Sequence, residues 1–268
     1  MSYESHYYWN NNRIKYRTLT EEDYRKICNG LSTLQNIMSE IDYCLMLRDN
    51  LYEFFEACEN TEINDQKNFN MLNRRMMNWL NSFYAWIEYH ERHYKTLFAG
   101  IKSKYHSNHF EYRFAYAMRR YTTHQTVCVS KLSFDLLAEK TTIQIPLDEL
   151  LQNGQELNST LRKELNELQE QSDFIDAVSF AKGFYSMFES MQKEIWESIL
   201  ADGHKVLLSI MEYMQSNRHI ILESYITKDG SHVKTVGSFL FLYQQKIQQT
   251  AIPSHMMQYM AEDGSLLS

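Results

Sequence analysis

Hydrophobic residues recur at steps of three and four over most of this chain, which is the period of an amphipathic helix. After a helix start at Thr20, this period runs from Leu31 to Phe55, and it resumes from Phe69 to Ile101. Only a short polar stretch, near residues 59–65, separates the two runs. Long helices with a short connection usually pack antiparallel, so the pattern predicts a helical hairpin that begins a bundle.

A shorter third helix is expected at residues 109–123, after a second polar break at residues 102–108. Its apolar face would consist of Phe110, Phe114, Met118 and Tyr121. The pattern then changes to alternating β-branched residues in 126–137 and 141–145, which predicts a β-hairpin closed by Pro146. Residues 1–19 show no steady period, and we expect them to form an irregular arm.

The second half of the chain again has the helical period. The segments concerned are a leucine stripe from Leu157 to Leu168, a long helix from Phe174 that ends near Asp202-Gly203, and helices at 206–214 and 236–249. A turn is expected at 228–230, while 220–226 is ambiguous and the tail after Pro253 is poorly specified. The predicted fold is therefore mainly α: a helical bundle with a small β-hairpin insertion and a second helical half. We expect a helical bundle at 20–128 and a β-hairpin with a C-terminal helical region at 129–268, either separate or packed as one domain.

Composition agrees with a helical globular protein. The chain has only 8 Gly and 2 Pro in 268 residues, too few for a sandwich of strands with many tight turns. Its start lacks the features of a secretory signal, and no apolar run is long enough to span a membrane, so we expect a cytoplasmic location. The four cysteines form no C-x-x-C pair and are expected to be buried thiols.

Charge is unevenly distributed along the chain. The formal net charge of −7 argues against a protein that coats nucleic acid over its whole surface. Residues 90–125, however, contain seven Lys and Arg against two acids, which leaves −12 for the rest of the chain, and they hold five of the ten histidines. One region is therefore basic, aromatic and titratable near neutral pH.

The predicted third helix gathers the groups that could bind phosphate. Opposite its apolar face we expect Tyr112, Tyr116, Arg119, Arg120 and Thr123. Arginine donates paired hydrogen bonds to anionic oxygens, tyrosine rings stack on bases, and histidine exchanges a proton near pH 7. The candidate catalytic residues are Arg119, Arg120 and His124, and the candidate RNA-binding residues are Tyr112, Arg113, Tyr116 and Tyr121.

Two long helices, a shorter third helix and an R-x4-H spacing at its end resemble the HEPN superfamily, the helical domains of many bacterial toxins and defence ribonucleases. The resemblance covers about residues 20–128. It implies that Arg119 is the motif arginine, that His124 is the motif histidine, and that two chains pair to form one metal-independent RNA-cleaving site. No cofactor is expected. The residue after the motif arginine is usually small and polar in that family, whereas here it is Arg120.

Helix geometry leaves the partner of His124 open. On a continuous helix, Arg119 and His124 are about 140° apart, whereas Arg120 and His124 share a face. Either the helix ends near Thr122 or Arg120 is the functional partner. In a ribonuclease of this type the RNA 2′-hydroxyl would attack its own 3′-phosphate, His124 would move a proton, and an arginine would stabilise the developing charge.

Two other functions fit the sequence. One is a non-catalytic helical scaffold or regulatory protein that binds RNA or a protein partner, the latter through the C-terminal helices. The other is a metal-binding helical bundle, because His90-x-x-His93 and His106-x-x-His109 have a spacing that can ligate zinc or iron from a helix. A histidine on an apolar stripe, as His90 is, more often packs in a core.

Overall fold

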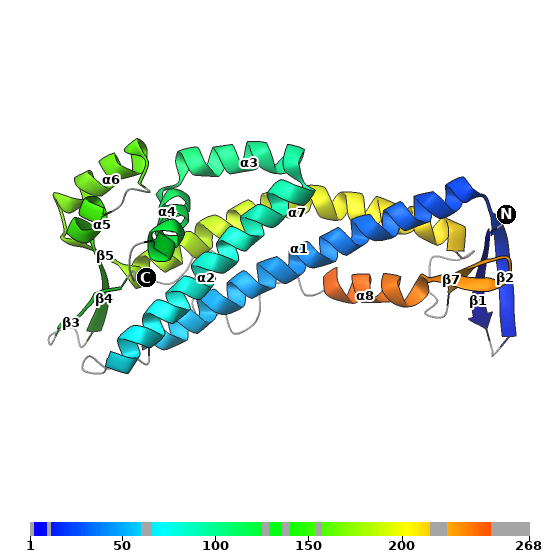
Figure 1. Ribbon diagram of the computed structural model, residues 1–268, viewed down its shortest axis with the longest axis horizontal. Helices are drawn as coiled ribbons and strands as arrows, with labels where there is room; N and C mark the ends of the chain where they lie inside the picture. The colour runs from blue at the N-terminus through cyan, green and yellow to red at the C-terminus, as the bar shows by residue number, and fades with distance from the viewer. Residues whose placement is uncertain are drawn as a thin grey trace. The chain divides into compact units, whose positions relative to one another are not determined.

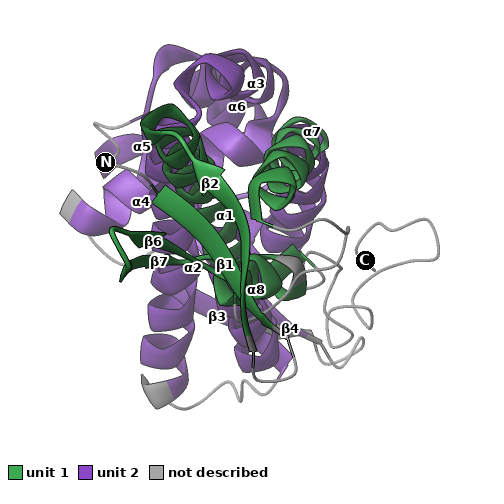
Figure 2. Cartoon of the chain, turned by 90° about the vertical axis from the view of Figure 1, so that its right-hand side faces the viewer, with its two compact units in different colours: residues 1–42, 196–253 green, residues 43–195, 254–268 purple. Residues whose placement is uncertain are grey.

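The computed structural model describes residues 3–9, 12–59, 66–124, 129–135, 140–153, 157–214 and 224–247. These residues are mainly α-helical and include two small antiparallel sheets (Figure 1), which confirms the predicted mainly α class. The chain divides into two compact units, residues 1–42 with 196–253 and residues 43–195 with 254–268 (Figure 2). The division falls inside the two longest described helices, α1 (Glu21–Glu59) and α7 (Ala177–Met214).

The first unit contains a four-stranded sheet of order β2-β1-β6-β7. Its strands are β1 (Tyr3–Trp9), β2 (Asn12–Leu19), β6 (Tyr225–Lys228) and β7 (Ser231–Thr235), and each pair is antiparallel. The prediction of an irregular arm at 1–19 is therefore wrong. Strand β1 pairs with β6, more than 200 residues away, and a local pattern cannot show such a pairing. The predicted turn at 228–230 is confirmed, with positive φ at Asp229 (49°) and Gly230 (84°) between β6 and β7.

Helices of the first unit pack closely on each other and on the sheet. The ring of Tyr3 in β1 stacks on Tyr24 of α1, with 4.1 Å between centroids. The prediction that a helix ends near Asp202-Gly203 is wrong, because α7 continues through this point to Met214. Gly203 instead allows a close approach, since a Cβ there would collide with Ile37 of α1 and with Tyr243 of α8 (Gly237–Ile247).

In the second unit, helix α2 (Gln66–His93) runs antiparallel to the end of α1, as predicted. Successive contacts between the two helices advance in opposite directions along the chain. The contacts are Tyr43 with Tyr89, Asn50 with Ser82 and Phe54 with Trp79. The start of α7 covers the same aromatic stripe, where Trp79 lies 4.7 Å from Phe184 and Trp86 lies 5.2 Å from Phe188 between ring centroids. The core of this unit is thus largely aromatic.

The predicted helix at 69–101 is broken at Tyr94, whose φ and ψ of −130° and 34° leave the helical region. A separate helix, α3 (Lys95–Asn108), follows, so the polar break expected at 102–108 is also wrong. Phe98 of α3 packs back on Trp86 and His90, at 5.7 and 5.0 Å between ring centroids. The hydrophobic period continues across the break because both helices contact the same core.

Helix α4 (Phe110–His124) confirms the predicted short aromatic helix. The predicted hairpin is confirmed in its described part, β3 (Lys131–Asp135) and β4 (Lys140–Pro146). Strand β5 (Phe174–Asp176) joins this sheet where a helix start was expected, and α5 (Leu147–Asn153) and α6 (Ser159–Gln169) lie between β4 and β5 in the chain. Buried Asn73 of α2 anchors the segment after α4 through two 2.8 Å hydrogen bonds with the backbone of Val129.

The described cysteines form no disulfide with one another. Cys44 is buried, whereas Cys28 and Cys58 are partly exposed, and Cys128 lies outside the described residues. Burial raises the pKa of the Cys58 thiol. Among the helices that the structure describes, none combines the length and apolar character needed to cross a membrane.

Candidate functional site

Helix α4 is continuous from Phe110 to His124, so it does not end near Thr122. Arg119 and His124 are therefore about 140° apart around the helix, and Arg120 is about 40° from His124. Arg119 is partly exposed and Arg120 is exposed, while the side chain of His124 lies outside the described part of the structure. Of the two arrangements left open by the sequence, the continuous helix favours Arg120 as the residue that shares a face with His124.

Four side chains from three helices form a continuous polar and aromatic surface, which we call the Arg119 surface: Tyr84 of α2, Lys102 of α3, and Tyr116 and Arg119 of α4. The Arg119 guanidinium carbon lies 4.2 Å from the centroid of the Tyr84 ring. The rings of Tyr84 and Tyr116 are 5.6 Å apart, and the ammonium of Lys102 lies 5.8 Å from the centroid of Tyr116. The cations therefore flank two aromatic rings, in contacts that cation–π attraction stabilises.

The Tyr84 ring holds the Arg119 side chain in place, but no described carboxylate balances its positive charge. Its Nε is buried and has no hydrogen-bond partner, and no described carboxylate forms an ion pair with its guanidinium. Lys102 differs, because its ammonium contacts a Glu91 carboxylate oxygen at 2.5 Å. Burial, together with the neighbouring Tyr116, raises the pKa of Tyr84, so its phenol stays protonated at neutral pH. The surface thus offers an unpaired guanidinium beside hydroxyl groups that can donate hydrogen bonds.

A pocket of about 510 Å³ adjoins this surface between the end of α2 and α3. Its floor includes the buried ring of Phe98, and its polar lining comprises Glu91, Lys95, Lys102, Ser103 and His106. Burial and then the charges of Arg113 and Lys102 lower the pKa of His106, which favours the neutral imidazole. Lys102 borders both features, since it lines the pocket and contacts the Tyr116 ring.

Three of the predicted RNA-binding residues are buried. The prediction that Tyr112 lies on the outer side is wrong: it is 0% exposed, and its ring packs edge-on against Phe83 at 5.4 Å. Tyr121 belongs to the apolar face, as expected, and is 2% exposed. Their rings are not available for stacking on a ligand. Tyr116 remains partly exposed.

The Arg113 side chain connects neighbouring helices. It forms a bidentate ion pair with Glu164 of α6, and it donates hydrogen bonds to the carbonyls of His106 (2.6 Å) and Ser107 (3.0 Å). These carbonyls lie in the last turn of α3, where backbone acceptors lack helical partners. Arg113 therefore joins the end of α3 to α4 and α6, and its donors are already used.

Sequence reasoning did not identify Tyr84 and Lys102 as members of a site. Tyr84 lies between the stripe positions Phe83 and Trp86, so periodicity assigned it only to a helix. Lys102 was counted in the basic segment, but it was placed in a polar break. Tyr84 and Arg119 come together through the register in which α2 packs on α4. The sequence does not specify that register.

The two histidine pairs do not assemble into a metal site among the described residues, which contain no group of three or more potential ligands. His90 is 0% exposed, and its Nδ1 lies 2.8 Å from the carbonyl oxygen of Trp86. His93 stacks on Tyr89 instead. His109 stacks on Tyr105.

Comparison with protein-family models, curated proteins and solved structures finds no match to the chain. The similarity to the HEPN superfamily therefore rests on the helix order and on the spacing of Arg119 and His124. The break at Tyr94 makes the helix that carries these residues the fourth in the chain and not the third.

Proposed function

We propose that this chain binds single-stranded RNA on the Arg119 surface. The observation that carries the proposal is the stack of Arg119 on Tyr84, in which a guanidinium without an ion pair is fixed at the surface by an aromatic ring. A fixed guanidinium donates to phosphate oxygens at a lower entropic cost than a mobile one. Tyr84 and Tyr116, both partly exposed, provide ring edges and faces for bases beside it.

The neighbouring pocket favours an RNA strand as the ligand over a single phosphate group. Lys102 connects the Tyr116 ring to the space between α2 and α3, where Lys95 and His106 add further donors. An RNA strand could place one phosphate at Arg119 and a base or second phosphate in this pocket. Single-strand binding commonly combines such a basic path with aromatic rings.

The test is a fluorescence anisotropy titration of a labelled 12-nucleotide oligouridylate. We expect Arg119→Gln to weaken binding on the order of tenfold, about 1.4 kcal/mol, and to reduce the slope of log K against log salt by about 0.7. Arg74→Gln is the matched control, because Arg74 is an exposed arginine of the same helix as Tyr84 and is not part of the Arg119 surface. Binding that is absent in the wild type, or equally weakened by both substitutions, would contradict the proposal.

A second candidate function is metal-independent cleavage of the bound strand, as in the HEPN-like endoribonucleases of toxin and anti-phage systems. The continuous helix favours it, because Arg120 and His124 occupy positions one turn apart on α4. The RNA 2′-oxygen would attack the adjacent phosphorus while the 5′-oxygen of the next nucleotide leaves. His124 would accept or return the proton and Arg120 would stabilise the phosphorane-like charge, which yields a 2′,3′-cyclic phosphate and a 5′-hydroxyl. In this proposal two copies of the chain pair to complete the site.

A further inference from the structure

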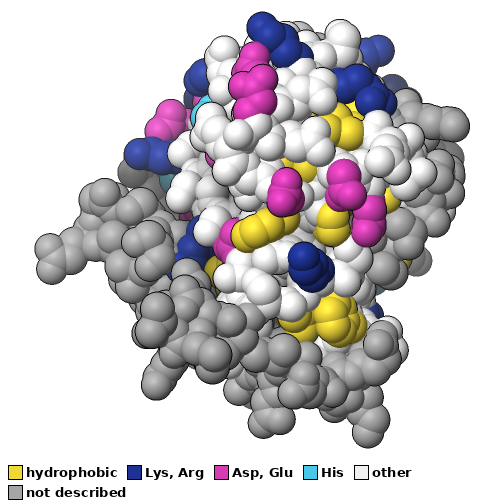
Figure 3. Space-filling model, turned by 90° about the vertical axis from the view of Figure 1, so that its left-hand side faces the viewer, with side chains coloured by type: hydrophobic (Ala, Val, Ile, Leu, Met, Phe, Trp, Pro, Cys, Tyr) yellow, Lys and Arg dark blue, Asp and Glu magenta, His cyan; other side chains and the backbone are white. Residues whose placement is uncertain are grey.

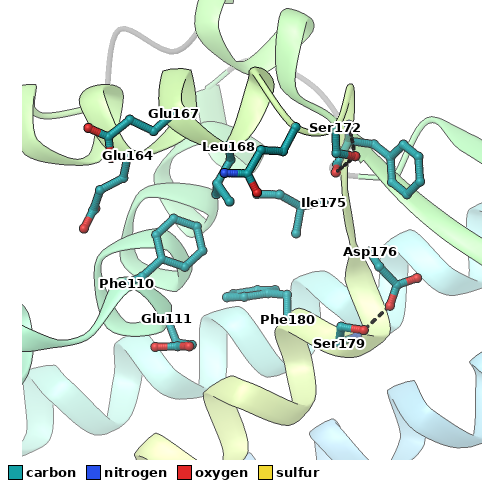
Figure 4. A pocket seen from close by; sticks show the side chains of 12 residues that line it. Phe110, Glu111, Glu164, Glu167, Leu168, Ser172, Ile175, Asp176, Ser179 and Phe180 are labelled. Atoms are coloured by element: carbon teal, nitrogen blue, oxygen red, sulfur yellow. Dashed lines mark hydrogen bonds between the residues drawn. The ribbon is translucent and has the colours of Figure 1, made fainter. Parts of the chain in front are cut away.

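A second pocket of the same unit, with a volume of about 540 Å³, shares no residue with the Arg119 surface. It is formed by the first turn of α4, by α6, by β5 and by the first turns of α7 (Figure 4). Its apolar part includes Phe110, Leu168, Ile175 and Phe180. The volume lies in the range of pockets that hold small organic ligands.

Charge in this pocket is of one sign. Among the described residues that line it, four carry carboxylates and none is Lys or Arg: Glu111, Glu164, Glu167 and Asp176. The face of the molecule seen in Figure 3 shows acidic side chains beside exposed hydrophobic ones, and it carries Lys and Arg side chains as well. A ligand that fits both properties has an apolar body and a positive charge.

Three of the four carboxylates already have partners. Glu164 is paired with Arg113, Glu167 lies 3.7 Å from Lys163, and Asp176 accepts a 2.7 Å hydrogen bond from the backbone N–H of Ser179 (Figure 4). Glu111 has neither a cation nor a hydrogen-bond donor among the described residues. It is the carboxylate of this pocket whose charge remains to be balanced.

The surroundings of the unpaired Glu111 carboxylate are partly apolar. Its side chain is only partly exposed and lies near the rings of Phe110 and Phe180 (Figure 4). Gly183 of α7 makes space for it, because a Cβ at that position would lie 3.2 Å from Glu111 Oε1 and 3.3 Å from its Cγ. A cation that reaches this carboxylate would form an ion pair beside aromatic rings, where the attraction is screened less than in open water.

We propose that this pocket binds a small organic amine in its protonated form. The apolar body would lie against Phe110 and Phe180, and the ammonium would pair with Glu111. The faces of the two rings add a favourable contact for the same charge. The proposal does not depend on RNA binding, because the two sites use different residues and ligands of opposite charge.

Isothermal titration calorimetry with 2-phenylethylamine at pH 7 tests it, with 2-phenylethanol as the neutral analogue of the same shape. We expect the amine to bind and the alcohol to bind at least about tenfold more weakly, a difference of roughly 1.4 kcal/mol. Glu111→Gln should remove most of this preference. Glu170→Gln is the matched control, because Glu170 is an exposed glutamate next to α6 that does not line the pocket.

Gly183→Ala provides a second variant that keeps the carboxylate. The added methyl group must displace the Glu111 side chain, so we expect weaker amine binding with an unchanged affinity for the alcohol. Circular dichroism melting of each variant shows whether it is folded before the titration. Equal binding of amine and alcohol, no binding of either to the folded wild type, or equal losses in Glu111→Gln and Glu170→Gln would overturn the proposal.

Discussion

Replacing Arg48 by Met is expected to lower the free energy of unfolding by about 3–5 kcal/mol. The Arg48 side chain is 2% exposed in α1, and it donates from Nε and from a terminal nitrogen to the two oxygens of Glu189 in α7, at 2.8 and 2.9 Å. Methionine fills part of the volume but leaves the Glu189 carboxylate, which is 19% exposed, without its partner. Urea denaturation followed by circular dichroism measures the loss.

The partner substitution separates charge from packing. In the Arg48→Met background, Glu189→Met removes the unpaired carboxylate, so we expect it to recover a large part of the lost stability. Arg25→Met is the control for the loss of an exposed arginine, because Arg25 is 73% exposed and its pair with Glu21 should contribute about 0.5 kcal/mol or less. A double variant no more stable than Arg48→Met alone would show that the charge pair is not the cause.

Cleavage of RNA in EDTA should fall by about 10²- to 10⁴-fold in His124→Ala if His124 transfers the proton. The substrate is a labelled oligoribonucleotide, and the product is identified as a 2′,3′-cyclic phosphate by mass spectrometry. Arg120→Gln should lower kcat, because Arg120 would stabilise charge that develops in the transition state. Arg119→Gln should mainly raise KM, because its proposed role is to hold the strand.

His204→Ala is the matched control for this experiment, since His204 is an exposed histidine of α7 outside the second unit. Cleavage that persists in His124→Ala, or that requires a divalent metal, would contradict the cleavage mechanism. A wild-type protein that binds RNA but does not cleave it would remove the second candidate function and leave RNA binding in place.

Much of the fold could be predicted because its elements have local signatures. The apolar period predicts α2 and α4, and the change to β-branched alternation predicts the β3–β4 hairpin. The break at Tyr94 has no such signature, because residues on both sides contact the same aromatic core. Strand β1 was missed for a different reason. It forms hydrogen bonds with β6, and the stability of that pairing depends on residues far apart in the chain.

The candidate site could be predicted only in part. Arg119 and Tyr116 were identified from their positions on one helix, and both are partly exposed. Tyr112 was misplaced because a single helix period does not show that other elements cover the start of α4. Tyr84 was missed because its proximity to Arg119 depends on how α2 packs on α4, and this register is set by side-chain packing between them.

The most direct test of the central claim is photochemical cross-linking of the full-length protein to an RNA that contains 4-thiouridine, with the attached residues identified by mass spectrometry. The Arg119 surface predicts attachment at Tyr84 and Tyr116 and at the peptides around Lys102. These products should decrease in Arg119→Gln and be unchanged in Arg74→Gln. Attachment mainly at the sheet residues Tyr8 and Tyr225, or attachment that Arg119→Gln does not reduce, would contradict it.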